Sequence, residues 1–106
     1  MATSATLQAL AEPHRKAILD VLREGESPVG QLASRLGQSQ PGVSKHLRVL
    51  RDAGLVTVRA DAQRRLYRVQ PEPLEELDAW IATYRDLWAG RLDRLQDALD
   101  QERERA

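Results

Sequence analysis

The sequence predicts a mainly helical chain that carries one small β-hairpin. Apolar residues recur at intervals of three and four over most of the chain, as they do on one face of a helix. Glycine and proline divide this pattern into short segments, which indicates several helices joined by tight turns. Over residues 55–69 the pattern changes to two runs rich in β-branched residues around a short polar stretch, which is typical of a hairpin.

Length and composition limit the possible classes of protein. The 106 residues predict one domain, spanning 1–106, with a core large enough to need no covalent support. The sequence contains no cysteine, which excludes disulfides, thiolate metal sites and iron–sulfur clusters within the chain. No apolar run approaches the length of a membrane span, and the first ten residues lack the basic start of a signal peptide. We therefore expect a cytoplasmic protein with no membrane partner.

The first two predicted helices lie before residue 25. One covers 3–11 and ends at Glu12, because the residue before a proline is pushed out of the helical region. The next begins at Pro13, whose missing N–H has no cost in a first turn, and runs to about Glu24. Gly25 is expected to end it.

Residues 27–54 predict a helix-turn-helix. Ser27 followed by proline is typical of a helix start, and Gly37 of a helix end. Ser39 is expected to cap the second helix of the pair, which ends before Gly54. A short helix, a turn containing glycine and a second helix with a polar outer face form the pattern of this motif.

Residues 55–70 predict a two-stranded wing that follows the helix-turn-helix. The strands are expected at 55–59 and 65–69, with a five-residue loop at 60–64. A hairpin of this size is unstable alone, so it is expected to pack against the helices. The predicted fold is therefore a winged helix-turn-helix with five helices and a two-stranded wing.

The last predicted helix is a single element over 71–101 with a near-heptad apolar seam. The seam could be internal core, a dimer interface or the wall of a ligand pocket. A helix of about seven turns is too long for so small a body to cover, so we expect it to pair with a second copy, together with 3–11. The predicted dimer interface comprises Leu7, Leu10, Leu77, Ile81, Tyr84, Trp88, Leu92 and Leu95.

The net charge of zero conceals a basic middle segment. Residues 35–70 hold eight basic and two acidic side chains, a net charge of +6, whereas 71–106 hold five basic and ten acidic ones. A basic segment of this kind is expected for a polyanion partner, and next to a helix-turn-helix it indicates double-stranded DNA. The alternative is a winged-helix module that binds proteins and not DNA, but such a module has no need for this charge.

The helix over 39–54 is expected to enter the major groove, where polar side chains near its start contact base edges. Gln40 suits adenine and Lys45 suits guanine or phosphate, while Arg48 and the wing arginines suit phosphates. His46 is expected either to contact DNA or to pack against the preceding helix. The predicted DNA-binding residues are Ser39, Gln40, Gly42, Ser44, Lys45, His46, Arg48, Arg51, Gln63, Arg64 and Arg65.

Three runs carry a resemblance to a known family: LAEPHRKAILDVL, SPVGQLASRLGQSQPGVSKHLRVLRDAGLV and RRLYRV. Together they resemble the arsenic-repressor (ArsR) family of bacterial winged-helix regulators over residues 7–70. The resemblance implies a homodimeric transcriptional repressor. A two-fold dimer would place its recognition helices about 34–36 Å apart and imply a near-palindromic operator. The run WIATYRDLW resembles a subgroup of the family without metal sites.

We expect no metal ion and no cofactor. In the family that the chain resembles, sensor sites use cysteines before the recognition helix or Asp/His pairs in the last helix. The chain has Val29, Gly30 and Gln31 at the first position and no histidine in its last helix. Its two histidines, His14 and His46, fall in different predicted elements, whereas a metal site needs several oriented ligands. No catalytic motif occurs, so an enzyme is not expected.

Overall fold

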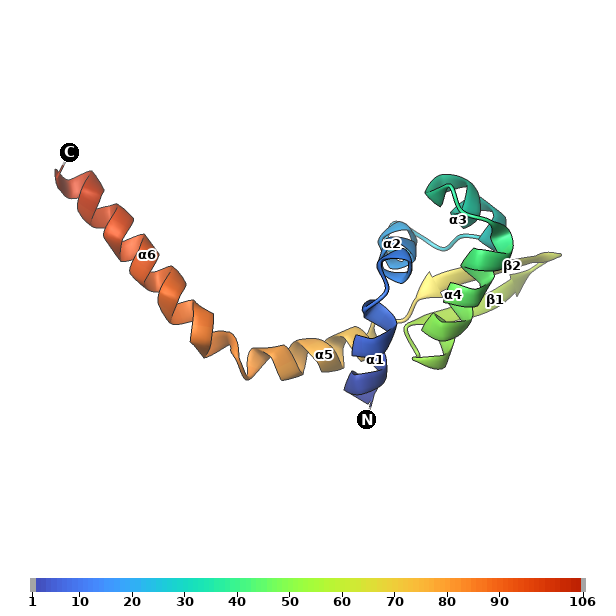
Figure 1. Cartoon of the computed structure of the whole chain (residues 1–106), viewed down its shortest axis with the longest axis horizontal. Helices are drawn as coiled ribbons and strands as arrows, with labels where there is room; N and C mark the ends of the chain where they lie inside the picture. Colours follow the sequence, from blue (N-terminus) through green and yellow to red (C-terminus); the bar gives the residue numbers. More distant parts are fainter. Residues whose placement is uncertain (1, 106) are drawn as a thin grey trace.

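The computed structural model describes residues 2–105 and contains six helices and one antiparallel hairpin (Figure 1). The elements follow in the order α1 (Ala2–Leu10), α2 (Pro13–Leu22), α3 (Val29–Leu36), α4 (Gln40–Asp52), β1 (Val56–Asp61), β2 (Arg64–Val69), α5 (Glu72–Ala82) and α6 (Arg85–Arg105). The winged helix-turn-helix predicted from the sequence is confirmed, with one helix more than expected.

The core lies where α2, α3 and α4 meet the hairpin. Ile18, Leu32 and Leu50, one from each of these helices, are completely buried. On α4, Val43 and Leu47 complete a stripe at the spacing of one helix face, so the opposite face of α4 is directed outward. The apolar stripe thus sets which side chains of α4 are available to a partner.

The hairpin turn is shorter than predicted. Val56 is opposite Val69 and Asp61 is opposite Arg64, which leaves Ala62 and Gln63 alone in the turn. Ala62 has a φ of 57°, the positive value that two-residue hairpin turns require at their first central position. The expected five-residue loop was wrong because both strands continue to the tip. Consequently Arg64, which was predicted to lie in the loop, is the first residue of β2.

An additional backbone pairing holds the hairpin to the helices. Ser27 forms an antiparallel bridge with Tyr67, in which each N–H donates to the other residue's carbonyl at 3.0 and 2.9 Å. Ser27 was expected to cap α3, but the helix begins one residue later than predicted, at Val29. Pro28 takes the N-cap position, and the Ser27 hydroxyl donates to its carbonyl. The wing is therefore attached to the body at the beginning of α3.

The predicted single helix over 71–101 is broken in two. At Thr83 and Tyr84 the backbone N–H groups bond to carbonyls three residues back, and the Thr83 hydroxyl donates to the Trp80 carbonyl at 2.7 Å. A threonine hydroxyl that takes a backbone carbonyl competes with the regular helical bond, which is a local reason for the break. The second piece, α6, continues to Arg105, four residues beyond the expected end.

The two pieces of this region have different surroundings. Helix α5 packs against α1, whereas α6 projects away from the rest of the chain, as Figure 1 shows. Every residue of α6 is exposed. The radius of gyration is 19.2 Å, whereas a compact domain of this length has one of about 13 Å. Within residues 2–105, no helix has the length and apolar character needed to cross a bilayer.

Candidate nucleic-acid interface

The start of α4 is held by a side-chain cap. The Ser39 hydroxyl accepts a hydrogen bond from the Gly42 N–H at 3.1 Å, and Ser39 has the extended backbone of an N-cap residue. A Cβ at position 42 would lie 3.0 Å from this hydroxyl oxygen, so glycine permits the close approach. Both residues were predicted to contact DNA, and the structure shows that they shape the helix start.

Replacing Ser39 by alanine is expected to lower the free energy of unfolding by about 1 kcal/mol, because it removes this cap. Urea denaturation would measure the change. Ser34, an exposed serine within α3, supplies the control, since its replacement by alanine removes no cap. Equal stability of the two variants would contradict the capping role of Ser39.

The outward face of α4 carries the polar side chains predicted from the sequence. Gln40, Ser44, Lys45, Arg48 and Arg51 are all exposed. Lys45 and Arg48 lie opposite the buried stripe, and the other three flank it, so packing of α4 in the core fixes their direction. The helix therefore presents two polar residues and three cations on one surface.

A groove of about 530 Å³ lies between α4 and the hairpin. Its lining residues, which define the α4–hairpin groove, are Ser44, Arg48, Arg51, Asp52, Arg65 and Tyr67. Four of these were predicted DNA contacts, and the groove joins residues from both predicted regions. Asp52 and Tyr67 were not predicted as part of the site. Strand alternation could have identified Tyr67, because it lies on the same face of β2 as Arg65 and opposite the buried Leu66.

Ion pairs neutralise part of the basic segment and leave the groove cationic. The pairs are Arg35 with Glu24 at 2.8 Å, Arg59 with Glu26 at 2.5 Å and Arg64 with Asp61 at 3.2 Å. Within the described part of the chain, Lys45, Arg48, Arg51 and Arg65 form no ion pair. Arg68, which also forms no ion pair within the described residues, lies on the other face of β2. Most of the unneutralised positive charge of this segment is therefore on α4 and the facing side of β2, where an anion can approach.

The pair between Arg59 and Glu26 joins β1 to the segment before α3. Two guanidinium nitrogens donate to the two carboxylate oxygens, at 2.9 and 2.5 Å. These bonds lower the pKa of Glu26 and raise the pKa of Arg59. Together with the Ser27–Tyr67 bridge, the pair restrains the wing relative to the helices.

Replacing Glu26 by glutamine is expected to reduce stability at neutral pH and to have less effect in acid. The pKa of Glu26 is below its ordinary value of 4.5 in the folded chain, so the pair stabilises the fold above that value. This stabilisation is lost as the pH falls through the folded-state pKa. Urea unfolding at about pH 7 and about pH 3 would measure it. If the free energies of unfolding of wild type and Glu26→Gln differ by the same amount at both pH values, this role is contradicted.

The tip of the hairpin carries the remaining predicted DNA contacts. Gln63 and Arg64 are exposed, and the Arg64 guanidinium donates to Asp61. Both residues stay predictions for DNA contact. Exposed ion pairs are weak, so the Arg64–Asp61 pair does not prevent Arg64 from contacting a phosphate.

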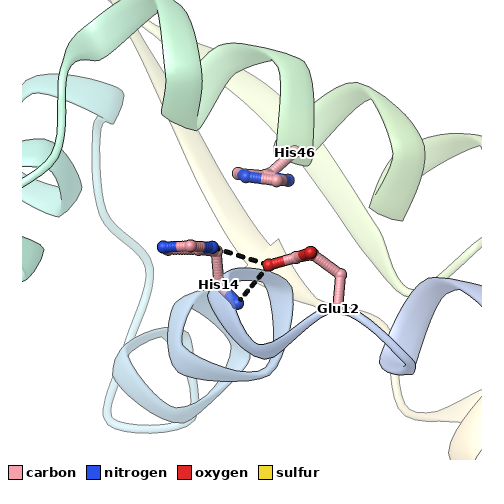
Figure 2. Close-up of side chains that lie close together, drawn as sticks. All are labelled: Glu12, His14 and His46. Carbon is pink, nitrogen blue, oxygen red and sulfur yellow. Dashed lines mark hydrogen bonds and ion pairs between the residues drawn. The ribbon is translucent and has the colours of Figure 1, made fainter.

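The ring of His46 faces α2 and not the outer surface of α4. It stacks on His14 with ring centroids 5.6 Å apart and an angle of 11° between the planes. The Glu12 carboxylate lies beside both rings (Figure 2). Its Oε1 is 2.6 Å from Nδ1 of the His14 ring and also accepts a hydrogen bond from the backbone N–H of His14 at 3.0 Å. These bonds lower the pKa of Glu12. We name these three residues the Glu–His cluster.

The cluster corrects two expectations. The ring of His46 stacks on His14 at the beginning of α2, which is not the helix that it was expected to face, and DNA contact by His46 stays a prediction. The two histidines, which fall in different elements and were not expected to share a site, are neighbours. The missed signal is Glu12, whose side chain caps α2 and thereby holds its carboxylate beside His14.

The predicted dimer interface divides into an exposed and a partly buried group. Leu10, Leu77 and Ile81 are partly buried near the α1–α5 contact, whereas Leu7 and Tyr84 are 44% and 46% exposed. On α6 four large apolar residues share one side, within an arc of about 60°, and Leu87 lies outside that arc. This α6 stripe consists of Trp88, Leu92, Leu95 and Leu99, which are between 43% and 61% exposed.

Comparisons with known proteins agree with this architecture. A family model described as a helix-turn-helix domain matches residues 10–59. The chain is 38% identical to the HTH-type transcriptional regulator Rv2034 of Mycobacterium tuberculosis over 95 residues, covering 90% of this chain and 86% of that protein.

Two solved structures are also similar. The ArsR family transcriptional regulator RHA00566 has a TM-score of 0.73 at 31% identity, over 83% of this chain and 91% of that one. The homodimeric winged helix-turn-helix DNA-binding domain of Mb0332 from Mycobacterium bovis has a TM-score of 0.66 at 32% identity, over 80% and 79% of the two chains.

Proposed function

We propose that this chain, which belongs to the ArsR family of winged helix-turn-helix transcriptional regulators, is a homodimeric repressor that contacts its operator through α4 and the hairpin. The family consists of DNA-binding regulators and not of enzymes. The observation that carries the proposal is the α4–hairpin groove, because it combines exposed, unneutralised arginines from two elements.

In this arrangement the first half of α4 lies in the major groove. Gln40, Ser44 and Lys45 face the base edges, where an amide suits adenine and an ammonium suits guanine or a phosphate. Ser39 and Gly42 contribute indirectly, because they fix the helix start whose N–H groups favour a phosphate.

The α4–hairpin groove receives the phosphate backbone. Arg48 and Arg51 reach it from the helix, and Arg65 reaches it from the opposite wall. These contacts position the protein and carry no sequence information. Gln63 and Arg64 at the hairpin tip then lie over the adjacent minor groove. Binding should be strongly salt dependent, because each neutralised phosphate releases counterions.

In the proposed dimer, a second copy of the chain supplies the other half of the DNA-binding surface. The α6 stripe finds no cover within residues 2–105, and an exposed apolar stripe of this length is suited to a partner helix. In the proposed organisation, 27–54 is the helix-turn-helix, 55–70 is the wing, and 3–11 with 71–101 form the dimer contact. A two-fold axis between copies places the two α4 helices about 34–36 Å apart on a near-palindromic operator.

Selection of bound duplexes from a random pool would test this function. We expect enrichment of near-palindromic sites whose half-sites are about 10–10.5 base pairs apart, with two chains bound to each duplex. Weak binding to every duplex, with no dependence on salt, would contradict the proposal and favour a module that binds proteins.

A further inference from the structure

The Glu–His cluster brings together three donor groups from two elements. Glu12 and His14 lie at the start of α2, and His46 lies in the middle of α4. One donor atom from each of the three lies within 4.8 Å of the others. Figure 2 shows the two rings and the carboxylate facing a common space. We propose that Glu12, His14 and His46 bind a divalent transition-metal ion that links α2 to the recognition helix.

The donor set selects the class of ion. Two imidazole nitrogens and one carboxylate suit zinc and its neighbours in the first transition row. Calcium and magnesium prefer sites built from oxygen, so the two imidazoles disfavour them. Three protein ligands leave a fourth tetrahedral position, and because His14 is exposed, water can occupy it.

Two of the ligands are already positioned. Glu12 is held by the hydrogen bond that its Oε1 accepts from the His14 backbone, and its Oε2 makes no hydrogen bond within residues 3–105. His46 is half-buried and fixed by the packing of α4.

His14, the third ligand, can change its side-chain conformation to complete the site. Zinc–ligand bonds of about 2.0–2.2 Å place donors closer together than the separations in this structure, so the cluster must contract. The side chain of His14 is 59% exposed and can rotate away from its stacked position to do so. Binding therefore replaces the stacking of the two rings by rotation of the His14 side chain.

The sequence makes this site unusually easy to test. The chain contains two histidines and no cysteine, so any site with two imidazole ligands in one chain must use both His14 and His46. Zinc titration of the dimeric protein, followed by calorimetry and by the NMR signals of the two imidazoles, reports binding and ligand identity together. We expect one zinc ion for each chain, with both imidazole signals shifting over the same range of added metal.

Three variants provide the decisive comparison. His14→Gln and His46→Gln should each weaken zinc binding by at least about tenfold. Glu12→Gln should also weaken it, while its amide oxygen keeps the cap of α2. Glu76→Gln, which changes an exposed acid on α5, is the matched control and should bind zinc as the wild type does. Circular dichroism would confirm that each variant is folded.

Other results would overturn the proposal. Zinc affinity that is unchanged in both histidine variants would place the ion elsewhere. A shift of one imidazole signal alone, or an ion shared between two chains, would show that the cluster is not the site. An affinity in the millimolar range for the wild type would mean that the stacked rings do not open for a metal ion.

Discussion

Replacing Arg48 and Arg65 together by alanine is expected to weaken operator binding by at least about a hundredfold, while the chain stays folded and dimeric. The two side chains lie on opposite walls of the α4–hairpin groove, so the variant removes one phosphate-binding cation from each wall. A hydrogen bond to a charged group contributes about 1.5–3 kcal/mol, and each chain of the variant forms two fewer. Gel-shift titrations at several salt concentrations would measure both the affinity and the salt slope, which should fall by about 0.9 for each phosphate that is no longer neutralised.

A second pair of arginines provides the matched control. Arg23 and Arg35 are exposed at the ends of α2 and α3 and do not line the α4–hairpin groove, and their joint replacement by alanine changes the net charge equally. This variant should bind the operator nearly as the wild type does. An equal loss of affinity in both double variants would indicate a general effect of net charge and would contradict the assigned groove.

Replacing Leu95 by glutamate is expected to convert the dimer to a monomer and thereby to abolish tight operator binding. Leu95 belongs to the α6 stripe and is 61% exposed in the isolated chain. In a two-fold interface each substitution occurs twice, and covering a leucine contributes about 1.5–3 kcal/mol before the cost of burying a charge is added. Sedimentation equilibrium would show a dimer dissociation constant raised by at least about a hundredfold.

The opposite side of α6 offers the control for this prediction. Gln101→Glu adds the same single charge about 120–150° around the helix from the α6 stripe. It should leave the dimer unchanged. Dissociation of both variants would show that charge on α6 and not the stripe governs association, whereas a dimeric Leu95→Glu would exclude the stripe from the interface.

The parts of the fold that were predictable from the sequence have local causes. The caps, glycines and prolines around 27–54 place the helix-turn-helix, and Ser39 caps α4 as expected. The period of the apolar residues also predicts which face of α4 is exposed, and hence the groove arginines. In contrast, the short hairpin turn depends on a positive φ at Ala62, and alanine gives no sign of that conformation.

The features that sequence reasoning missed depend on packing between distant segments. Ser27 has the residue type of a helix cap, but its pairing with Tyr67, forty residues away, determines its backbone. The proximity of His14 and His46 depends in the same way on how α2 lies across α4. The apolar seam continues through Thr83 without interruption, so its spacing does not reveal the break that follows Ala82.

In the proposed dimer, where two copies pair along α6, a small rotation at Thr83 and Tyr84 would displace the far end of that helix. With a length of about 31 Å, α6 would move its far end by roughly 5 Å for a rotation of about 10° at the break. The separation of the two α4 helices then depends on two peptide units and on the contacts that brace them. Arg85 reaches back to Asp78 at 2.7 Å, and Trp80 meets Tyr84 edge to face across the same turn. In the proposed dimer, these contacts would therefore help to set the distance between the two α4 helices, and with it the half-site spacing of the operator.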